Sequence, residues 1–225
     1  MAHIYGVAGE WARVRGTVNG LWPLFVSIFA LGVASALMVF VVLEIGALLT
    51  VVALCAVAYF LYRGERRMEN FYKGARGEER VAGILRSLPD TYHVFNDFVA
   101  GRAHVDHVVV GPAGVFAIET KFWRGKVTLE EGHILLDGRL PDHAPLAQAQ
   151  KEAALVKATL AKLGWTGAVT PVLAFASNTF EAKIAESQGT VILNANHLRE
   201  SFATERVTIP AAELERLVRL METNS

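Results

Sequence analysis

The chain has one cysteine, Cys55, and no net charge. A single cysteine cannot form an intrachain disulfide, so disulfide-stapled secreted folds are excluded, and Cys55 is expected to pack as a small apolar side chain. The 22 basic and 22 acidic residues balance each other. No global basic field is therefore present of the kind that draws many proteins to nucleic acids.

Motifs for zinc, for a nucleotide phosphate loop and for a serine or cysteine nucleophile are also missing. His104 and His107 stand three apart in a predicted strand and should point to opposite faces, and no cysteine pair or HExxH accompanies them. Gly74 and Gly77 are not followed by the Lys-Ser/Thr of a phosphate loop. These classes of enzyme have no support in the sequence.

Charge is nearly absent from Leu21 to Tyr62, where Glu44 is the only charged residue. A membrane-spanning helix needs about 20 apolar residues, and a cut at Glu44 and Gly46 leaves about that length on each side. We therefore predict a transmembrane helical hairpin over 21–62, with Glu44 in its short turn.

Basic residues flank this stretch and are absent from its turn: Arg13 and Arg15 precede it, and Arg63, Arg66, Arg67 and Lys73 follow it. Positive loops stay on the cytoplasmic side, which predicts a multi-pass protein of the cell (inner) membrane with both termini in the cytoplasm. The basic residues near Arg63, Arg66 and Arg67 would also suit anionic lipid heads.

Two alternatives to a spanning hairpin remain open. Ala34-Ser35-Ala36 is similar to a signal-peptide cleavage site, although the apolar run continues through it and a second apolar segment follows. A buried hairpin in a soluble protein would normally show polar residues along one side.

Two short apolar runs, Val105 to Val110 and Val115 to Ile118, flank the tetrad Gly111-Pro112-Ala113-Gly114. Proline at the second position and glycine at the fourth favour a tight turn, so the runs are predicted to form an antiparallel hairpin. If Gly111 faces Gly114, Asp106 lies opposite Glu119.

Two opposed acids repel each other, and burial strengthens the repulsion. A hard divalent cation, Mg²⁺ or Mn²⁺, would neutralise Asp106 and Glu119 while keeping waters for chemistry. Lys121 shares the face of Glu119 and could orient an attacking water. Alternatively, Glu119 and Lys121 form a solvated ion pair past the strand end, with Asp106 in a neighbouring turn.

The upstream segment from Ala75 to Leu88 has its apolar residues at helical spacing and should end before Pro89. Glu78 then lies near the apolar stripe and can face the sheet, whereas Glu79 lies on the far side. Both acids could instead simply favour the positive end of the helix dipole.

A second helix is predicted from Pro145 to about Leu163. Gln148 and Gln150 flank its buried stripe on opposite sides. Periodicity does not choose between them.

The stretch from Gly74 to about Phe180 resembles the nuclease-related domain (NERD), a branch of the PD-(D/E)xK nuclease superfamily. The resemblance rests on GARGEERV, VDHVVVGPAGVFAIETK and APLAQAQ. It implies that Asp106 and Glu119 bind Mg²⁺, that Glu78 completes the ligand shell, that Lys121 assists the water, and that Gln148 supports the site. Val105 stands where the superfamily has its proline.

Strands are predicted over Val169 to Ala176 and Thr190 to Leu193, and a last helix over Pro210 to Met221. The fold class expected is a mixed-sheet α/β (α+β), restriction-endonuclease-like core of αβββαβ order, preceded by the transmembrane hairpin. The expected divisions are a cytoplasmic segment (1–20), the hairpin (21–62), a basic juxtamembrane linker (63–73), the nuclease-related domain (74–182) and a completing strand and helix (183–225).

The expected function is a membrane-anchored nuclease that hydrolyses DNA or RNA with Mg²⁺ on the cytoplasmic side. The alternative is an adaptor of the same fold that binds nucleic acid or protein without cutting. The complete set of two acids and a lysine favours the first, and the neutral surface favours the second. Arg102, Arg124 and Lys126 flank the hairpin, but nothing selects one of them as a phosphate contact.

Overall fold

The computed structural model describes residues 1–225 except 41–42, 178, 204–207 and 224–225; the side chains of 37–40, 43–44, 46, 65–68, 70 and 203 are not described either. The chain divides into two compact units. One is Trp11–Lys73, and the other combines Met1–Glu10 with Gly74–Ser225.

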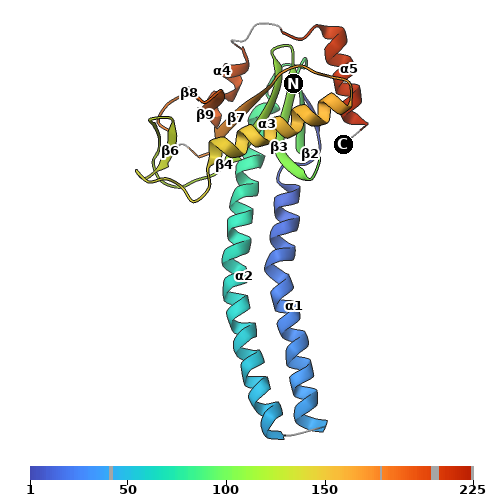
Figure 1. Ribbon diagram of the computed structural model, residues 1–225, viewed down its shortest axis with the longest axis vertical. Helices are drawn as coiled ribbons and strands as arrows, with labels where there is room; N and C mark the ends of the chain where they lie inside the picture. The colour runs from blue at the N-terminus through green and yellow to red at the C-terminus, as the bar shows by residue number, and fades with distance from the viewer. Residues whose placement is uncertain (41–42, 178, 204–207, 224–225) are drawn as a thin grey trace. The chain divides into compact units, whose positions relative to one another are not determined.

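The first unit is a pair of long helices (Figure 1). Helix α1 spans Glu10–Phe40, and α2 spans Leu43–Leu85, of which the first part belongs to this unit. The segments Glu10–Ala36 and Ala47–Gly64 are long and apolar enough to cross a membrane, and only 17% and 11% of their most apolar windows are buried. Such a large exposed apolar surface is unusual for a soluble domain.

The helix bounds correct one expectation, the position of Glu44, and add detail on two predicted segments. Helix α1 begins at Glu10, so much of the predicted 1–20 segment is already helical. Glu44 lies in the first turn of α2 and not in a turn before it, and residues 41–42 lie outside the described part of the chain. The predicted linker 63–73 is a continuous part of α2.

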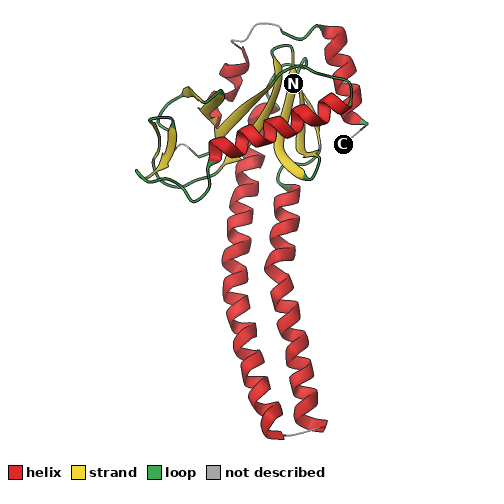
Figure 2. Cartoon of the chain, in the orientation of Figure 1, coloured by secondary structure: helices red, strands yellow, loops and turns green. Residues whose placement is uncertain are grey.

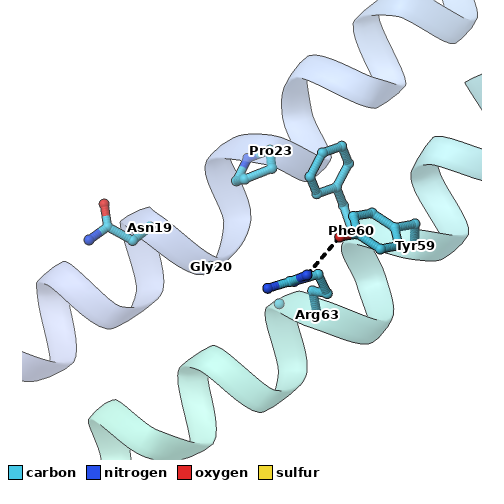
Figure 3. A pocket seen from close by; sticks show the side chains of 7 residues that line it. Asn19, Gly20, Pro23, Tyr59, Phe60 and Arg63 are labelled. Atoms are coloured by element: carbon cyan, nitrogen blue, oxygen red, sulfur yellow. Dashed lines mark hydrogen bonds between the residues drawn. The ribbon is translucent and has the colours of Figure 1, made fainter. Parts of the chain in front are cut away.

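Small residues bring the two helices close together. A Cβ on Gly16 would meet the side chain of Phe71 at 2.5 Å, and one on Gly64 would lie 3.0 Å from the carbonyl oxygen of Gly20. Beside this contact is a hollow of about 260 Å³ (Figure 3), lined by Asn19, Gly20, Pro23, Tyr59, Phe60, Arg63 and Gly64. The Arg63 guanidinium donates to the Tyr59 hydroxyl at 2.7 Å in that hollow.

The second unit is built on a mixed seven-stranded sheet, as the fold class predicted. Its order is β1-β2-β3-β4-β7-β9-β8. The strands are β1 (His3–Tyr5), β2 (His93–Ala100), β3 (Ala103–Gly111), β4 (Gly114–Lys121), β7 (Val169–Phe175), β8 (Ile184–Ser187) and β9 (Thr190–Asn194), with β5 (Val127–Glu130) and β6 (His133–Leu136) in a separate hairpin. Pairing is antiparallel along β2-β3-β4 and parallel along β4-β7-β9.

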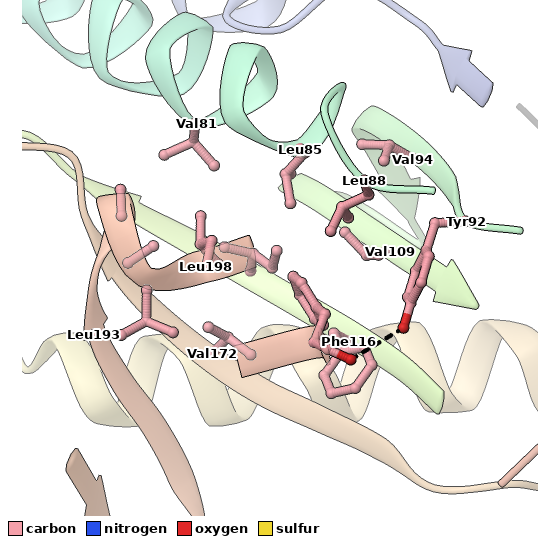
Figure 4. Close-up of a cluster of buried hydrophobic side chains, with 14 of the residues drawn as sticks. Val81, Leu85, Leu88, Tyr92, Val94, Val109, Phe116, Val172, Leu193 and Leu198 are labelled. Atoms are coloured by element: carbon pink, nitrogen blue, oxygen red, sulfur yellow. Dashed lines mark hydrogen bonds between the residues drawn. The ribbon is translucent and has the colours of Figure 1, made fainter. Parts of the chain in front are cut away.

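Helices cover both faces of this sheet (Figure 2). The end of α2 and α4 (Leu198–Ala203), which follows a 3-10 turn at Ala195–His197, pack on one face through a cluster that includes Val81, Leu85 and Leu198 (Figure 4). Helices α3 (Pro145–Lys162) and α5 (Ala211–Glu222) pack on the other. The αβββαβ order is therefore present.

The central hairpin has the predicted register. Gly111 pairs with Gly114, and the ladder continues to His107 and Ile118. Gly111 is required because a Cβ there would collide with the ring of Tyr92, and Gly114 has a φ of +144° that other residues rarely adopt.

Strand β1 was not predicted, because three residues carry no periodicity. It pairs in parallel with β2, with His3 opposite His93, and the His3 N–H donates to the Tyr92 carbonyl at 3.0 Å. The extreme N-terminus is therefore an edge strand of the sheet and not merely a segment before the first apolar helix.

The substitution Gly6→Ala should loosen β1. Gly6 and Gly189 have nearly the same φ, +72° and +70°, but a Cβ on Gly6 would meet the Asn96 carbonyl oxygen at 2.6 Å, whereas one on Gly189 meets nothing within 4 Å. Both variants bear the left-handed strain of about 1–2 kcal/mol. Gly6→Ala should lose about 1–3 kcal/mol more in denaturant unfolding of the full chain in detergent. Equal losses would show that β1 is not held as described.

Candidate functional site

Glu119 and Lys121 lie on the same face of β4, the middle strand of the sheet. Their side chains are only 5% and 19% exposed, and the Lys121 Nζ contacts a Glu119 carboxylate oxygen at 2.5 Å. The pair lies inside the strand and the fold, so it is not the solvated pair past the strand end that the sequence left open.

Asp106 lies beside this pair, on β3. The β3-β4 ladder ends one residue before it, and its carboxylate accepts the Thr120 backbone N–H at 2.7 Å. Asp106 thus contacts the backbone next to Glu119, and no direct cross-strand pair is formed. Burial and the nearby Glu119 and Glu78 carboxylates raise the pKa of Asp106 well above its usual range.

Glu78 reaches the same group of acids from α2. Burial, Asp97 and Glu119 together raise its pKa from 4.5 to about 7, although a hydrogen bond from the Gly9 backbone N–H opposes the shift. Its neighbour Glu79 is exposed. The structure therefore places the two acids as the helical stripe suggests.

The structure distinguishes Gln148 from Gln150. The Gln148 side-chain oxygen accepts from the Lys121 Nζ at 2.9 Å. Gln150 instead donates to the Gln188 carbonyl at 2.8 Å, away from these acids. Gln148 is thus the amide that holds the lysine.

Glu152 is a member of this cluster that the sequence analysis missed. It lies one turn after Gln148 on α3, is 92% buried, and accepts from the Gln148 side-chain nitrogen at 3.0 Å. Its second oxygen, Oε2, has no hydrogen-bond partner among the described residues. Burial and Glu119 raise its pKa from 4.5 to about 8. A charged residue three positions after Ala149, on the apolar stripe of the helix, was the available signal.

Asp97 is the second missed member. It occupies β2 at a φ of +53°, and its carboxylate lies 2.9 Å from the ring of His104. His107 points elsewhere, since it is buried and bound to Asn96 at 2.8 Å. The two histidines therefore have different partners, Asp97 and Asn96.

Five carboxylates thus form one cluster, in which the Lys121 ammonium pairs with Glu119; they belong to Glu78, Asp97, Asp106, Glu119 and Glu152. The raised pKa values share two causes, burial first and then the neighbouring negative charges. Binding protons or a cation would relieve the repulsion between these charges.

The donor set suits a hard cation. Carboxylate oxygens are the ligands that Mg²⁺ prefers, and Mg²⁺ commonly takes one or two of them while it keeps its waters. In the described part of the chain, no three His, Cys, Asp or Glu side chains are arranged to hold a metal. A site with only Asp106 and Glu119 as protein ligands does not need three such side chains.

Residues 73–176 match the family model described as the nuclease-related domain, NERD. This part of the chain is therefore a nuclease-related domain. The match confirms the resemblance seen from Gly74 onward, and all the acids above, with Lys121 and Gln148, lie inside it. No curated protein and no solved structure matched the chain.

The raised pKa values predict how stability depends on pH without divalent cations. Between about pH 4.5 and 8 the folded chain holds protons on Glu78 and Glu152 that the unfolded chain has released. The stabilisation is complete below the unfolded pKa and is lost as pH rises through about 7 and 8. The free energy of unfolding, measured in EDTA, should therefore fall over this range.

Glu152→Gln should reduce the fall in the free energy of unfolding at the upper end of this pH range, because the amide is neutral at every pH. Glu215→Gln, at a side chain 71% exposed on α5, is the matched control and should follow the parent profile. A Glu152→Gln profile parallel to the parent would contradict the assignment.

Proposed function

We propose that this NERD domain hydrolyses phosphodiester bonds of DNA or RNA with Mg²⁺ or Mn²⁺. The observation that carries the proposal is the position of the Lys121 ammonium, held by Glu119 and Gln148 beside Asp106. A positioned cation next to carboxylates that could hold a metal can stabilise the charge that develops on a phosphoryl group.

Asp106 and Glu119 would hold the metal, and Glu78 would approach it from α2. A divalent cation bound there supplies a Lewis acid for the phosphate and lowers the pKa of water. Lys121 would orient the attacking water, or neutralise charge on the phosphate. The Thr120 N–H fixes the Asp106 carboxylate in place for this role.

Gln148 and Glu152 would position the lysine and would not contact the substrate themselves. The Glu152 Oε1 accepts from the Gln148 nitrogen, which turns the Gln148 oxygen toward Lys121. The amide is therefore fixed in the orientation that accepts from an ammonium. This arrangement limits the positions available to the Lys121 Nζ.

Cleavage assays on the purified full chain in detergent test the proposal. The full chain is required because β1 belongs to the domain. Labelled single-stranded and duplex DNA and RNA should be cut with Mg²⁺ and not in EDTA. Glu119→Gln and Lys121→Met should each lower the rate by at least about 10²-fold, since each removes charge stabilisation at the reacting group.

Glu78→Gln and Glu79→Gln form the matched pair, because the two residues are adjacent and only Glu78 faces the acids. Glu78→Gln should slow cleavage, and Glu79→Gln should leave the rate unchanged. Equal activity of the parent, Glu119→Gln and Lys121→Met would rule out the proposal and indicate a contaminating nuclease.

The second candidate is an adaptor of the same fold that binds nucleic acid or protein without cutting. It is favoured by the zero net charge and by the lack of a preformed three-ligand metal cage among the described residues. Saturable binding of nucleic acid without cleavage in Mg²⁺ or Mn²⁺ would favour this function.

We also propose that Glu10–Ala36 and Ala47–Gly64 cross the cell (inner) membrane, with both chain ends in the cytoplasm. Their length, their hydropathy and the basic residues at their proposed cytoplasmic ends, Arg13, Arg15 and Arg63, support this topology. Arg63, in the hollow of Figure 3, is available to an anionic lipid head, while the side chains of Arg66 and Arg67 lie outside the described part.

Charges placed in the second span should weaken membrane association. Val51 and Leu54 are 58% and 52% exposed, and two lysines at these positions should each cost about 2.5–3.5 kcal/mol of insertion free energy. The variant should move into the soluble or aggregated fraction on carbonate extraction. Val99→Lys, at a 46% exposed valine of β2, should stay with the membrane as the parent does.

A further inference from the structure

A hollow of about 350 Å³ lies beside the strand end that carries Lys121. It belongs to the unit formed by Met1–Glu10 and Gly74–Ser225, here called the nuclease-related unit. It is lined by Trp123, Leu136, Arg139, Leu140, Pro141, Asp142 and His143. The last five of these form the loop that leads into α3. None of these residues takes part in the acid and lysine cluster.

The lining combines the groups that recognise a nucleotide. Trp123 is only partly buried and is held by a tilted contact with Phe175, with ring centroids 5.6 Å apart. Leu140 is apolar and 69% exposed. Arg139 has no ion pair among the described residues, so its guanidinium is available to a phosphate. Aromatic rings that stack on bases, together with cationic groups that follow the backbone, are the usual elements of single-strand recognition.

The hollow is also connected closely along the chain to the residues of the proposed reaction. Trp123 follows Lys121 by two residues, so their Cα atoms are at most about 7 Å apart. Phe175, which supports the Trp123 ring, is the sheet partner of Lys121. His143 precedes the start of α3 at Pro145 by two residues, where the helix dipole also favours negative charge.

We propose that this hollow binds an unpaired nucleotide next to the phosphodiester at Lys121, with its base on Trp123 and a phosphate on Arg139. The inference rests on the proposed hydrolysis and specifies its substrate as a strand with unpaired bases. A duplex keeps its bases stacked and paired, so its entry would require unstacking that costs a few kcal/mol. The site thus favours single strands over duplex.

The test is the binding of a fluorescein-labelled 12-nucleotide oligothymidine, measured by anisotropy with the full chain in detergent and Mg²⁺. A Lys121→Met background prevents cleavage during the measurement. Trp123→Ala should weaken binding about 5- to 150-fold, the range for loss of one base–aromatic stack. Trp123→Phe should retain most of the affinity because it keeps a ring.

Arg139→Gln should weaken binding and reduce its dependence on salt, because one phosphate contact is lost. Arg216→Gln is the matched control. Arg216 lines a different hollow, of about 400 Å³, beside α5, and its replacement should change neither quantity. A 12-base-pair duplex should bind more weakly than the single strand.

Unchanged binding in Trp123→Ala and Arg139→Gln, or equal affinity for strand and duplex, would overturn the inference. If a thermal melt shows that Trp123→Ala does not fold, the other two variants still test the inference. Trp123→Phe should retain most of the affinity, and Arg139→Gln should bind more weakly. The two proposals fail separately. Trp123-dependent binding without cleavage by the parent chain overturns only the hydrolysis, and cleavage with unchanged binding in these variants overturns only the subsite.

Discussion

The site depends on one constraint, a single ammonium held among more carboxylates than it can neutralise. Lys121 is fixed by Glu119 and Gln148, while the pKa values of Glu78, Asp106 and Glu152 are all raised. Such an arrangement is costly for a folded protein unless protons or a cation compensate for it. A divalent cation would stabilise a local excess of negative charge of this kind. The excess is local, because the net charge of the chain is zero.

The fold maintains this arrangement by drawing on several elements. Strand β4 lies in the middle of the sheet, so Glu119 is covered by neighbouring strands and by α3. Helix α3 contributes Gln148 and Glu152 one turn apart, and α2 brings Glu78 from another part of the chain. The N-terminal residues add the Gly9 N–H to Glu78. The local charge therefore depends on the packing of the whole nuclease-related unit.

Many features followed from local patterns. The hairpin register from Gly111 and Gly114, the helix from Pro145, and the mixed sheet were predicted because turn chemistry and periodicity are local properties. Strand β1 was missed because it is short and is stabilised by pairing with β2, which is distant in sequence. The boundary near Glu44 was misplaced because an apolar helix can accept one acid in its first turn.

The sequence alone determined the nuclease-related domain, the two apolar helices, and the placement of Glu119 and Lys121 on one strand face, since each depends on residues that are close together in the sequence. Only the tertiary structure decided that Gln148 and not Gln150 holds Lys121, and that Glu152 and Asp97 join the acids. Helical spacing fixes the face of a residue to within a broad angle. The partner that this face meets is set by how α3 and the strands pack together.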